Sequence, residues 1–181
     1  IYSTIEYRDK ADTATLILET SQEPPEEAIE YISNLCGIEP KNLYLILVPT
    51  SSIAGLTQIS GRIVETGIHR LMSLGFDPKL IRYADGYAPI MPIHPGQAEA
   101  MGRANDAILY GGKVCCHVEF DGSDETLEDL VQKAVSSASK QYGRPFGEIF
   151  REAGFDFYKI DPDLFSPAVL VVSNLKTGGT F

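Results

Sequence analysis

Two oppositely charged side chains, Arg62 and Glu65, lie three residues apart in the segment SGRIVETGIHRL (60–71). Apolar residues recur through this segment at helical spacing, which predicts a helix with the pair at the edge of its apolar face. Such a pair can be a solvated surface salt bridge that contributes a few tenths of a kcal/mol. It can also be a guanidinium that orients a carboxylate acting as a general base. The spacing alone leaves both interpretations open.

The preceding segment, TSSIAGLTQISGR (50–62), is rich in small and hydroxyl residues and lies between a predicted strand and the predicted helix. Helix N-termini bind anions, so an anion site at Ser60 and Gly61 is one interpretation. The other is a small-residue loop that lets strand and helix pack closely. The spacing of Gly55 and Gly61 does not fit the phosphate-binding P-loop pattern, and no G-x-G-x-x-G occurs, which disfavours a dinucleotide fold.

Cysteine and histidine give no pattern of a metal site or of nucleophilic catalysis. No C-x-x-C, H-x-x-x-H, HExxH or G-x-S-x-G spacing occurs. We therefore expect no metal, reduced thiols, and cysteines in a predicted strand that act as small hydrophobic residues. The residues concerned are Cys36, Cys115, Cys116, His69, His94 and His117.

The bulk composition excludes several classes of protein. The chain has 181 residues, 44% of them hydrophobic, a net charge of −10 and a pI near 4.7. An acidic chain lacks the Lys/Arg surplus that nucleic-acid binding requires. The longest apolar runs are too short to span a bilayer. We expect a cytoplasmic protein that binds neither nucleic acid nor membrane.

Strand-like and helix-like segments alternate, which predicts an α/β fold, with mixed α+β also open. A loop with three closely spaced prolines, DGYAPIMPIHPG (85–96), is expected to line a site. No internal domain boundary is predicted, and NLKTGGTF (174–181) is typical of a hairpin turn with a strand to follow. The predicted strands are 13–19, 43–48 (buried), 80–84, 107–111, 114–120 and 168–174; the predicted helices are 26–36, 60–75, 97–105, 125–141 and 145–154.

Beyond these patterns, the run LVPTSSIAGLTQISGRIVETGIHRL (47–71) resembles the methenyltetrahydromethanopterin cyclohydrolases. The likeness continues over nearly the whole chain, through GFDPKLIRYADGYAPIMPI, AMGRANDAILYGG, YGRPFGEIF and FDFYKIDPDLFSPAVLVVSNLKTG. The resemblance implies that residues 1–181 are the middle and C-terminal part of such a chain, lacking roughly its first third and a short final strand. It further implies two intertwined α/β domains in the parent enzyme, with the substrate cleft between them.

The resemblance also implies a reaction and its residues. The family reversibly hydrolyses N5,N10-methenyl-tetrahydromethanopterin to the N5-formyl compound, in one-carbon metabolism and methanogenesis. Glu65 would be the base that activates water and Arg62 would orient it. Gln58, Ser60 and Asn105 would contact the pterin, and the helix N-terminus at Ser60 and Gly61 would hold anionic groups. The family works as homotrimers or other homo-oligomers and uses no metal or cofactor.

Two other functions compete with this one. The chain could be a non-catalytic pterin-binding or assembly fragment of the same family, in which case the 181 residues alone would be inactive. A folate-type cyclohydrolase is disfavoured, because the Lys-containing motif and the dinucleotide fingerprint of that family are absent. The intact Arg62 and Glu65 favour the catalytic interpretation.

Overall fold

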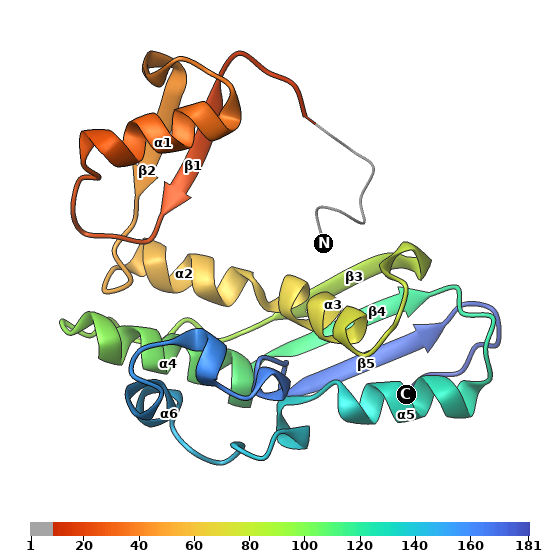
Figure 1. The fold of residues 1–181 in the computed structure, drawn as a ribbon. Coiled ribbons are helices and arrows are strands. Elements are labelled where there is room, and N and C mark those ends of the chain that lie inside the picture. The colour runs from red at the N-terminus through yellow and green to blue at the C-terminus, as the bar shows by residue number, and fades with distance from the viewer. Residues whose placement is uncertain (1–8) are drawn as a thin grey trace. The chain divides into compact units, whose positions relative to one another are not determined.

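The computed structural model describes residues 9–181 (Figure 1). Internal contacts divide the chain into an N-terminal unit, Ile1–Pro49, and a C-terminal unit, Thr50–Phe181. Each contains helices and a β-sheet, so the predicted α/β class is confirmed.

The N-terminal unit is a single strand–helix–strand motif. Strand β1 (Ala14–Leu18) is followed by helix α1 (Glu26–Cys36), the short 3₁₀ turn η1 (Pro40–Asn42) and strand β2 (Leu43–Leu47). The two strands are parallel, with Ala14 opposite Leu43 and Leu18 opposite Leu47. Helix α1 ends as predicted at Gly37, whose φ of 68° lies in the left-handed region that glycine adopts without a steric penalty.

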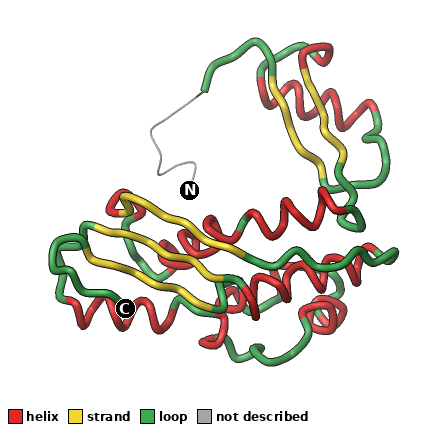
Figure 2. The backbone as a smooth tube through the Cα atoms, turned by 180° about the vertical axis from the view of Figure 1, so that it is seen from behind, coloured by secondary structure: helices red, strands yellow, loops and turns green. Residues whose placement is uncertain are grey.

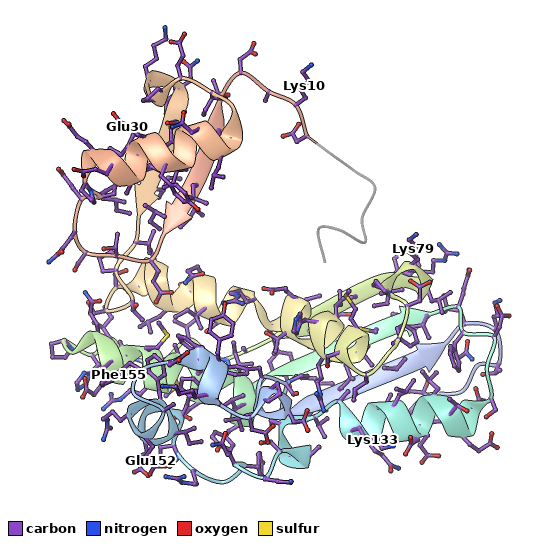
Figure 3. The ribbon with its side chains drawn as sticks, viewed as in Figure 1. Lys10, Glu30, Lys79, Lys133, Glu152 and Phe155 are labelled. Carbon is purple, nitrogen blue, oxygen red and sulfur yellow. The ribbon has the colours of Figure 1, made fainter. Side chains whose placement is uncertain are left out.

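The strand at 43–48 was predicted to be buried, and this prediction is wrong for the chain as it stands. Tyr44 and Ile46 on β2 are 57% and 49% exposed, because helix α1 covers only one face of the two-stranded sheet. Side chains such as Glu30 extend outward from α1 (Figure 3).

The C-terminal unit contains a three-stranded mixed sheet in the order β3–β4–β5. Strand β3 (Ile81–Tyr87) is antiparallel to β4 (Lys113–Val118), which is parallel to β5 (Val169–Asn174). The chain then turns back, and Phe181 exchanges two backbone hydrogen bonds with Val172 on β5. The predicted C-terminal hairpin is therefore confirmed.

Helices cover one face of this sheet. On β4, Val114, Cys116 and Val118 are buried while the alternate residues are only partly so. These three residues belong to one apolar cluster with Leu71 of helix α3 (Ile63–Ser73) and with Leu127 of helix α5 (Asp124–Lys133). Seen from behind, no helix of the C-terminal unit, Thr50–Phe181, crosses the opposite face of the three strands (Figure 2).

Two features of the predicted helices need correction. The segment 50–61 is not a loop, because Ile53–Gly61 forms helix α2, which runs directly into α3. The predicted helix at 125–141 is shorter, since α5 ends at Lys133 and a 3₁₀ turn, η3 (Ser136–Ala138), follows. Gly and Ser/Thr content suggested a loop where α2 forms, whereas the serines after Ala134 lie where α5 has already ended.

The strand predicted at 107–111 is wrong. Helix α4 extends over Gln97–Gly111 and ends only at the Gly111–Gly112 pair. Its apolar residues Ala107, Ile108 and Leu109 are all buried, so the short apolar run is a helix segment enclosed on several sides. Helix α6 (Phe146–Glu152) packs closely on α4, where Gly102 and Gly147 face each other.

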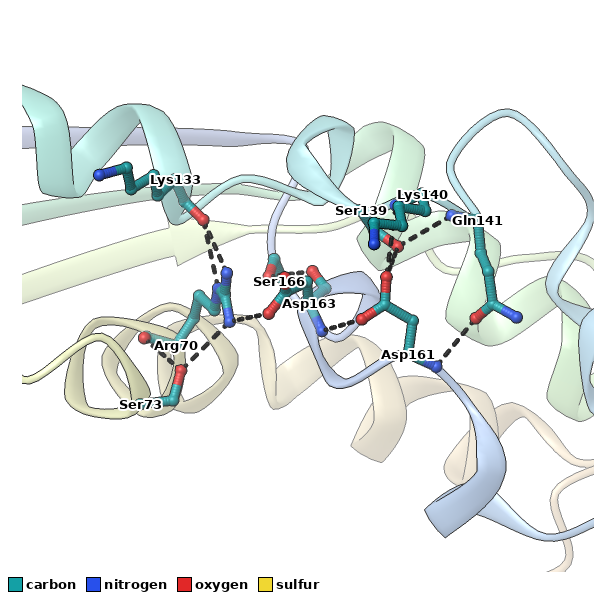
Figure 4. Close-up of polar contacts among 9 residues, drawn as sticks. All are labelled: Arg70, Ser73, Lys133, Ser139, Lys140, Gln141, Asp161, Asp163 and Ser166. Atoms are coloured by element: carbon teal, nitrogen blue, oxygen red, sulfur yellow. Dashed lines mark hydrogen bonds and ion pairs between the residues drawn. The ribbon is translucent and has the colours of Figure 1, made fainter.

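A polar network fixes the C-terminal end of α3 (Figure 4). Arg70, which is 5% exposed, donates from Nη1 to Asp163 Oδ1 at 2.6 Å and from Nη2 to the carbonyl oxygen of Lys133 at 2.9 Å. Asp163 lies in the 3₁₀ turn η5 (Pro162–Leu164), and Lys133 ends α5. Arg70 therefore connects three elements that are far apart in sequence.

Candidate active site

The junction of α2 and α3 positions the predicted catalytic pair. Arg62, with φ −75° and ψ 1°, is both the last cap of α2 and the first cap of α3. Glu65 lies in the first turn of α3. Arg62 Nε donates to Glu65 Oε2 at 3.0 Å, and Nη2 lies 3.5 Å from Oε1. The guanidinium thus meets both carboxylate oxygens, a geometry that fixes the plane of the carboxylate.

Both partners of this pair are accessible. The side chains of Arg62 and Glu65 are 59% and 57% exposed. The same helix turn is held by Thr66, whose backbone N–H and Oγ1 both donate to the carbonyl oxygen of Arg62, at 2.8 and 2.9 Å. The turn is ordered by its own hydrogen bonds while the carboxylate stays open to water.

An open groove of about 270 Å³ is lined in part by the residues on either side of Arg62 in the sequence. One wall comes from α2 and the start of α3, and the other from the end of β3 and the proline-rich loop. The lining residues are Thr57, Ser60, Gly61, Ile63, Val64, Gly86, Tyr87, Ala88 and Ile90. The prediction that this loop lines a site is consistent with Ala88 and Ile90 in the wall.

Arg62 and Glu65 are not among the lining residues, although Gly61, Ile63 and Val64 on either side of Arg62 are. The pair therefore does not line this groove, and its place at a substrate cleft stays a prediction.

The three predicted pterin contacts differ in their surroundings. Ser60 lines the groove, and its Oγ donates to the carbonyl oxygen of Pro89 at 2.8 Å. Asn105 lies on α4 and donates from Nδ2 to Met101 O, one turn earlier, at 2.9 Å. Gln58 is partly exposed on α2. The structure brings only Ser60 to the groove, and roles in substrate binding stay predictions for all three.

The sequence did not single out Tyr87 and Thr57 as site residues. Tyr87 ends β3 and is 65% exposed beside the groove. The available signal was the aromatic residue in the loop segment DGYAPIMPIHPG. Thr57 was obscured because its segment was taken as a loop.

Ser60 and Gly61 end α2 and directly precede Arg62, the N-cap of α3, so a helix N-terminus follows them and the anion site stays a prediction. Both residues lie at the C-terminal end of α2, where helix carbonyl groups are oriented outward. The N-terminus of α2 is at Ser52, whose Oγ accepts a hydrogen bond from the Gly55 N–H at 3.0 Å.

The cysteines of the chain are free thiols, and Cys116 lies in the core. Burial, followed by the nearby Cys115 and Asp85, raises the pKa of Cys116 to about 11, so it stays a protonated thiol at neutral pH. Within residues 9–181, no three His, Cys, Asp or Glu side chains are grouped as metal ligands would be. No helix in this part of the chain has the length and apolar character needed to cross a bilayer.

Comparisons with known proteins agree with one another. A protein-family profile described as "Cyclohydrolase (MCH)" matches residues 1–181. Similar curated proteins, each named methenyltetrahydromethanopterin cyclohydrolase, come from Methanococcoides burtonii (48% identical), Methanocaldococcus jannaschii (45%) and Methanothermobacter marburgensis (43%). The matches cover 99–100% of this chain and 56% of each relative. The chain therefore spans little more than half the length of these relatives.

Proposed function

The chain belongs to the cyclohydrolase (MCH) family, and from that premise we propose that the full-length protein is a methenyltetrahydromethanopterin cyclohydrolase. It hydrolyses the N5,N10-methenyl cation of tetrahydromethanopterin reversibly to the N5-formyl compound. The observation that carries the mechanism is the two-point contact between Arg62 and Glu65 at the α2–α3 junction.

The reaction requires the enzyme to position a water molecule and to accept a proton from it. Water adds to the amidinium carbon, Glu65 accepts one proton from it, and a C–O bond forms. The C–N10 bond then breaks, N10 takes up a proton, and the carbon remains on N5 as a formyl group. One proton is released in total, which balances the loss of the substrate's positive charge.

Arg62 acts through Glu65. By binding both oxygens it holds one orientation of the carboxylate. The ionised carboxylate attracts the cationic substrate and accepts a proton from water. Because the electrophile already carries positive charge, the reaction needs no Lewis acid to activate it, and we propose that the enzyme uses neither a metal nor a prosthetic group.

The groove beside the junction supports binding of the pterin ring system. Ile63, Val64 and Ile90 offer apolar surface, and Tyr87 offers an exposed aromatic face on which a planar heterocycle can stack. Such a groove would hold the substrate with its amidinium carbon toward the adjacent pair. Gln58, Ser60 and Asn105 remain the proposed polar contacts.

The state of the cysteines bears on the cellular compartment of the protein. The three cysteines are free, and Cys36 is exposed, which suits a reducing compartment such as the cytoplasm. We propose that the full-length protein works there as a homo-oligomer, with a trimer as the expected form.

The test is the loss of absorbance of methenyl-tetrahydromethanopterin on adding the full-length protein. Turnover to the N5-formyl compound is expected, and its absence with a folded protein would overturn the proposal. The same assay on the 181-residue chain addresses the alternative. Because the chain spans 56% of its relatives, pterin binding without turnover would assign this chain a binding role only.

A further inference from the structure

The face of the β1–β2 sheet that points away from α1 is apolar, and no other described part of the N-terminal unit covers it. Residues on this face alternate along the two strands: Thr15 and Ile17 on β1, Tyr44 and Ile46 on β2. Thr15 pairs with Tyr44 and Ile17 with Ile46, so the four side chains form two adjacent rows. Ile17, Tyr44 and Ile46 are 58%, 57% and 49% exposed, and none of the four carries a charge.

The unit lacks a core of its own. Among described residues up to Pro49, Ser33 is the only buried one, and no apolar side chain there is buried. Even Leu16, on the face toward α1, is 40% exposed. Two strands and one helix bury too little apolar surface to be stable alone.

Parallel strands impose a further requirement. Parallel sheets occur almost only with both faces covered, because the crossover helix protects one side and a second layer protects the other. Here β1 and β2 are parallel and α1 supplies one layer. The geometry of the strands thus calls for a second layer over Ile17, Tyr44 and Ile46.

The length of the relatives indicates where that layer comes from. The matched span is 56% of each relative, so a large share of a relative's polypeptide lies outside it. We propose that the polypeptide which the full-length protein carries beyond these 181 residues packs an apolar surface on the Thr15/Ile17/Tyr44/Ile46 face. This inference depends on family membership and on the fold, and not on the proposed catalytic roles.

A second copy of the chain is a poorer occupant. Stable interfaces between separate proteins take about 20–30 residues on each side, and this face offers four. A segment of the same polypeptide can be held by so small a face, because it does not lose the translational freedom that separate partners lose on association.

A photo-crosslinker at the face identifies its occupant. In the full-length protein, Tyr44→p-benzoylphenylalanine is irradiated and the linked peptides are mapped by mass spectrometry. A crosslink to polypeptide outside residues 1–181 of the same molecule is expected. A crosslink to residues 50–181 or to another copy, seen as a dimer on a denaturing gel, would overturn the proposal. The absence of any crosslinked peptide would overturn it as well. The same replacement at Tyr31, 66% exposed on α1, is the matched control and should not give the Tyr44 crosslink.

A second measurement uses stability. In the full-length protein, Ile46→Lys places a charge in the proposed contact and should lower the melting temperature clearly more than Leu35→Lys does. Leu35 is 70% exposed near the end of α1, away from the face, so it reports the effect of the same change in solvent. Equal effects of the two changes would contradict the proposal. If Ile46→Lys does not fold, the crosslink at position 44 still decides.

Discussion

Arg70 Nη1 donates to Asp163 Oδ1 at 2.6 Å, joining positions 93 residues apart. The Arg70 side chain is 6% exposed and that of Asp163 is 47% exposed. A buried guanidinium is thus paired with a partly exposed carboxylate (Figure 4). Arg70 and Glu65 lie on the same helix, α3. The pair therefore helps to fix the helix that carries the proposed base.

Replacing Asp163 with Asn should destabilise the protein, because the buried Arg70 charge then loses its anionic partner. We expect the free energy of unfolding to fall by about 1–3 kcal/mol in denaturant titrations. Asp129→Asn is the control, since Asp129 pairs with Lys133 where both side chains are about 60% exposed. That change should alter stability by less than about 1 kcal/mol. Equal effects would show that burial of Arg70 does not matter.

Glu65→Gln in the full-length protein keeps the shape of the side chain and removes the proton acceptor. General-base catalysis typically contributes about 10²–10⁴-fold, so kcat should fall by that order while the fold is kept. The matched control is Glu119→Gln, because Glu119 forms another exposed Arg–Glu pair with Arg82, at 2.7 Å, outside the groove. A normal kcat for Glu65→Gln would leave the Arg62–Glu65 pair as a surface salt bridge only.

Arg62→Lys separates orientation from charge. Lysine keeps the positive charge but cannot contact both carboxylate oxygens in one plane, so Glu65 loses its fixed orientation. We expect kcat to fall while KM changes less, because the change disturbs the position of the attacking water more than it disturbs pterin binding. Steady-state rates over substrate concentrations from below KM to saturation measure both constants. A kcat equal to that of the unchanged protein would show that Arg62 supplies only charge.

Asp106 should give stability an unusual dependence on pH. Burial raises the pKa of this carboxyl, although a hydrogen bond from the Phe146 N–H, at 2.8 Å, acts in the opposite direction. A raised folded-state pKa means that the fold prefers the protonated form, so Asp106 stabilises the fold as pH falls and loses this contribution as pH rises through the folded-state pKa. Relative to Asp106→Asn, which can still accept from Phe146, the unchanged protein should therefore gain stability on acidification above the ordinary Asp pKa of about 3.9. Denaturant titrations over that pH range check it; a relative loss on acidification would contradict it.

Activity of the full-length protein should survive dialysis against a strong chelator. The substrate is already a cation, and the proposed base is a carboxylate positioned by a guanidinium. The measurement is the cyclohydrolase rate before and after dialysis, with metal content determined in parallel. Loss of activity that zinc or iron restores would contradict the proposed mechanism.

Local sequence patterns predicted most of the elements, and their failures have physical causes. Gly37 and the strand at 168–174 were correctly placed, because a left-handed cap and an apolar β-branched run are strong local signals. The run 107–111 was misassigned because an apolar stretch enclosed on several sides has no exposed face to give it periodicity. Segment 50–61 was misassigned because its small residues suit close packing of α2 as well as a loop.

The pairing of Arg62 with Glu65 was predictable, since side chains three apart on a helix are neighbours. The helix break at Arg62 was not, because it depends on how α2 and α3 pack against separate parts of the unit. The loop with Tyr87 and Ile90 was expected to line a site, but its approach to α2 was not predictable, since it depends on long-range contacts such as that of Ser60 with Pro89.

The break between α2 and α3 has a mechanical consequence. Helix α2 is attached to the proline-rich loop through Ser60, whereas α3 is attached to the sheet, where Gly67 approaches Val114 closely. The two differently anchored helices meet at Arg62, the residue whose side chain contacts Glu65. A tilt of α2 against α3 would therefore act on the backbone of the residue that orients the proposed base.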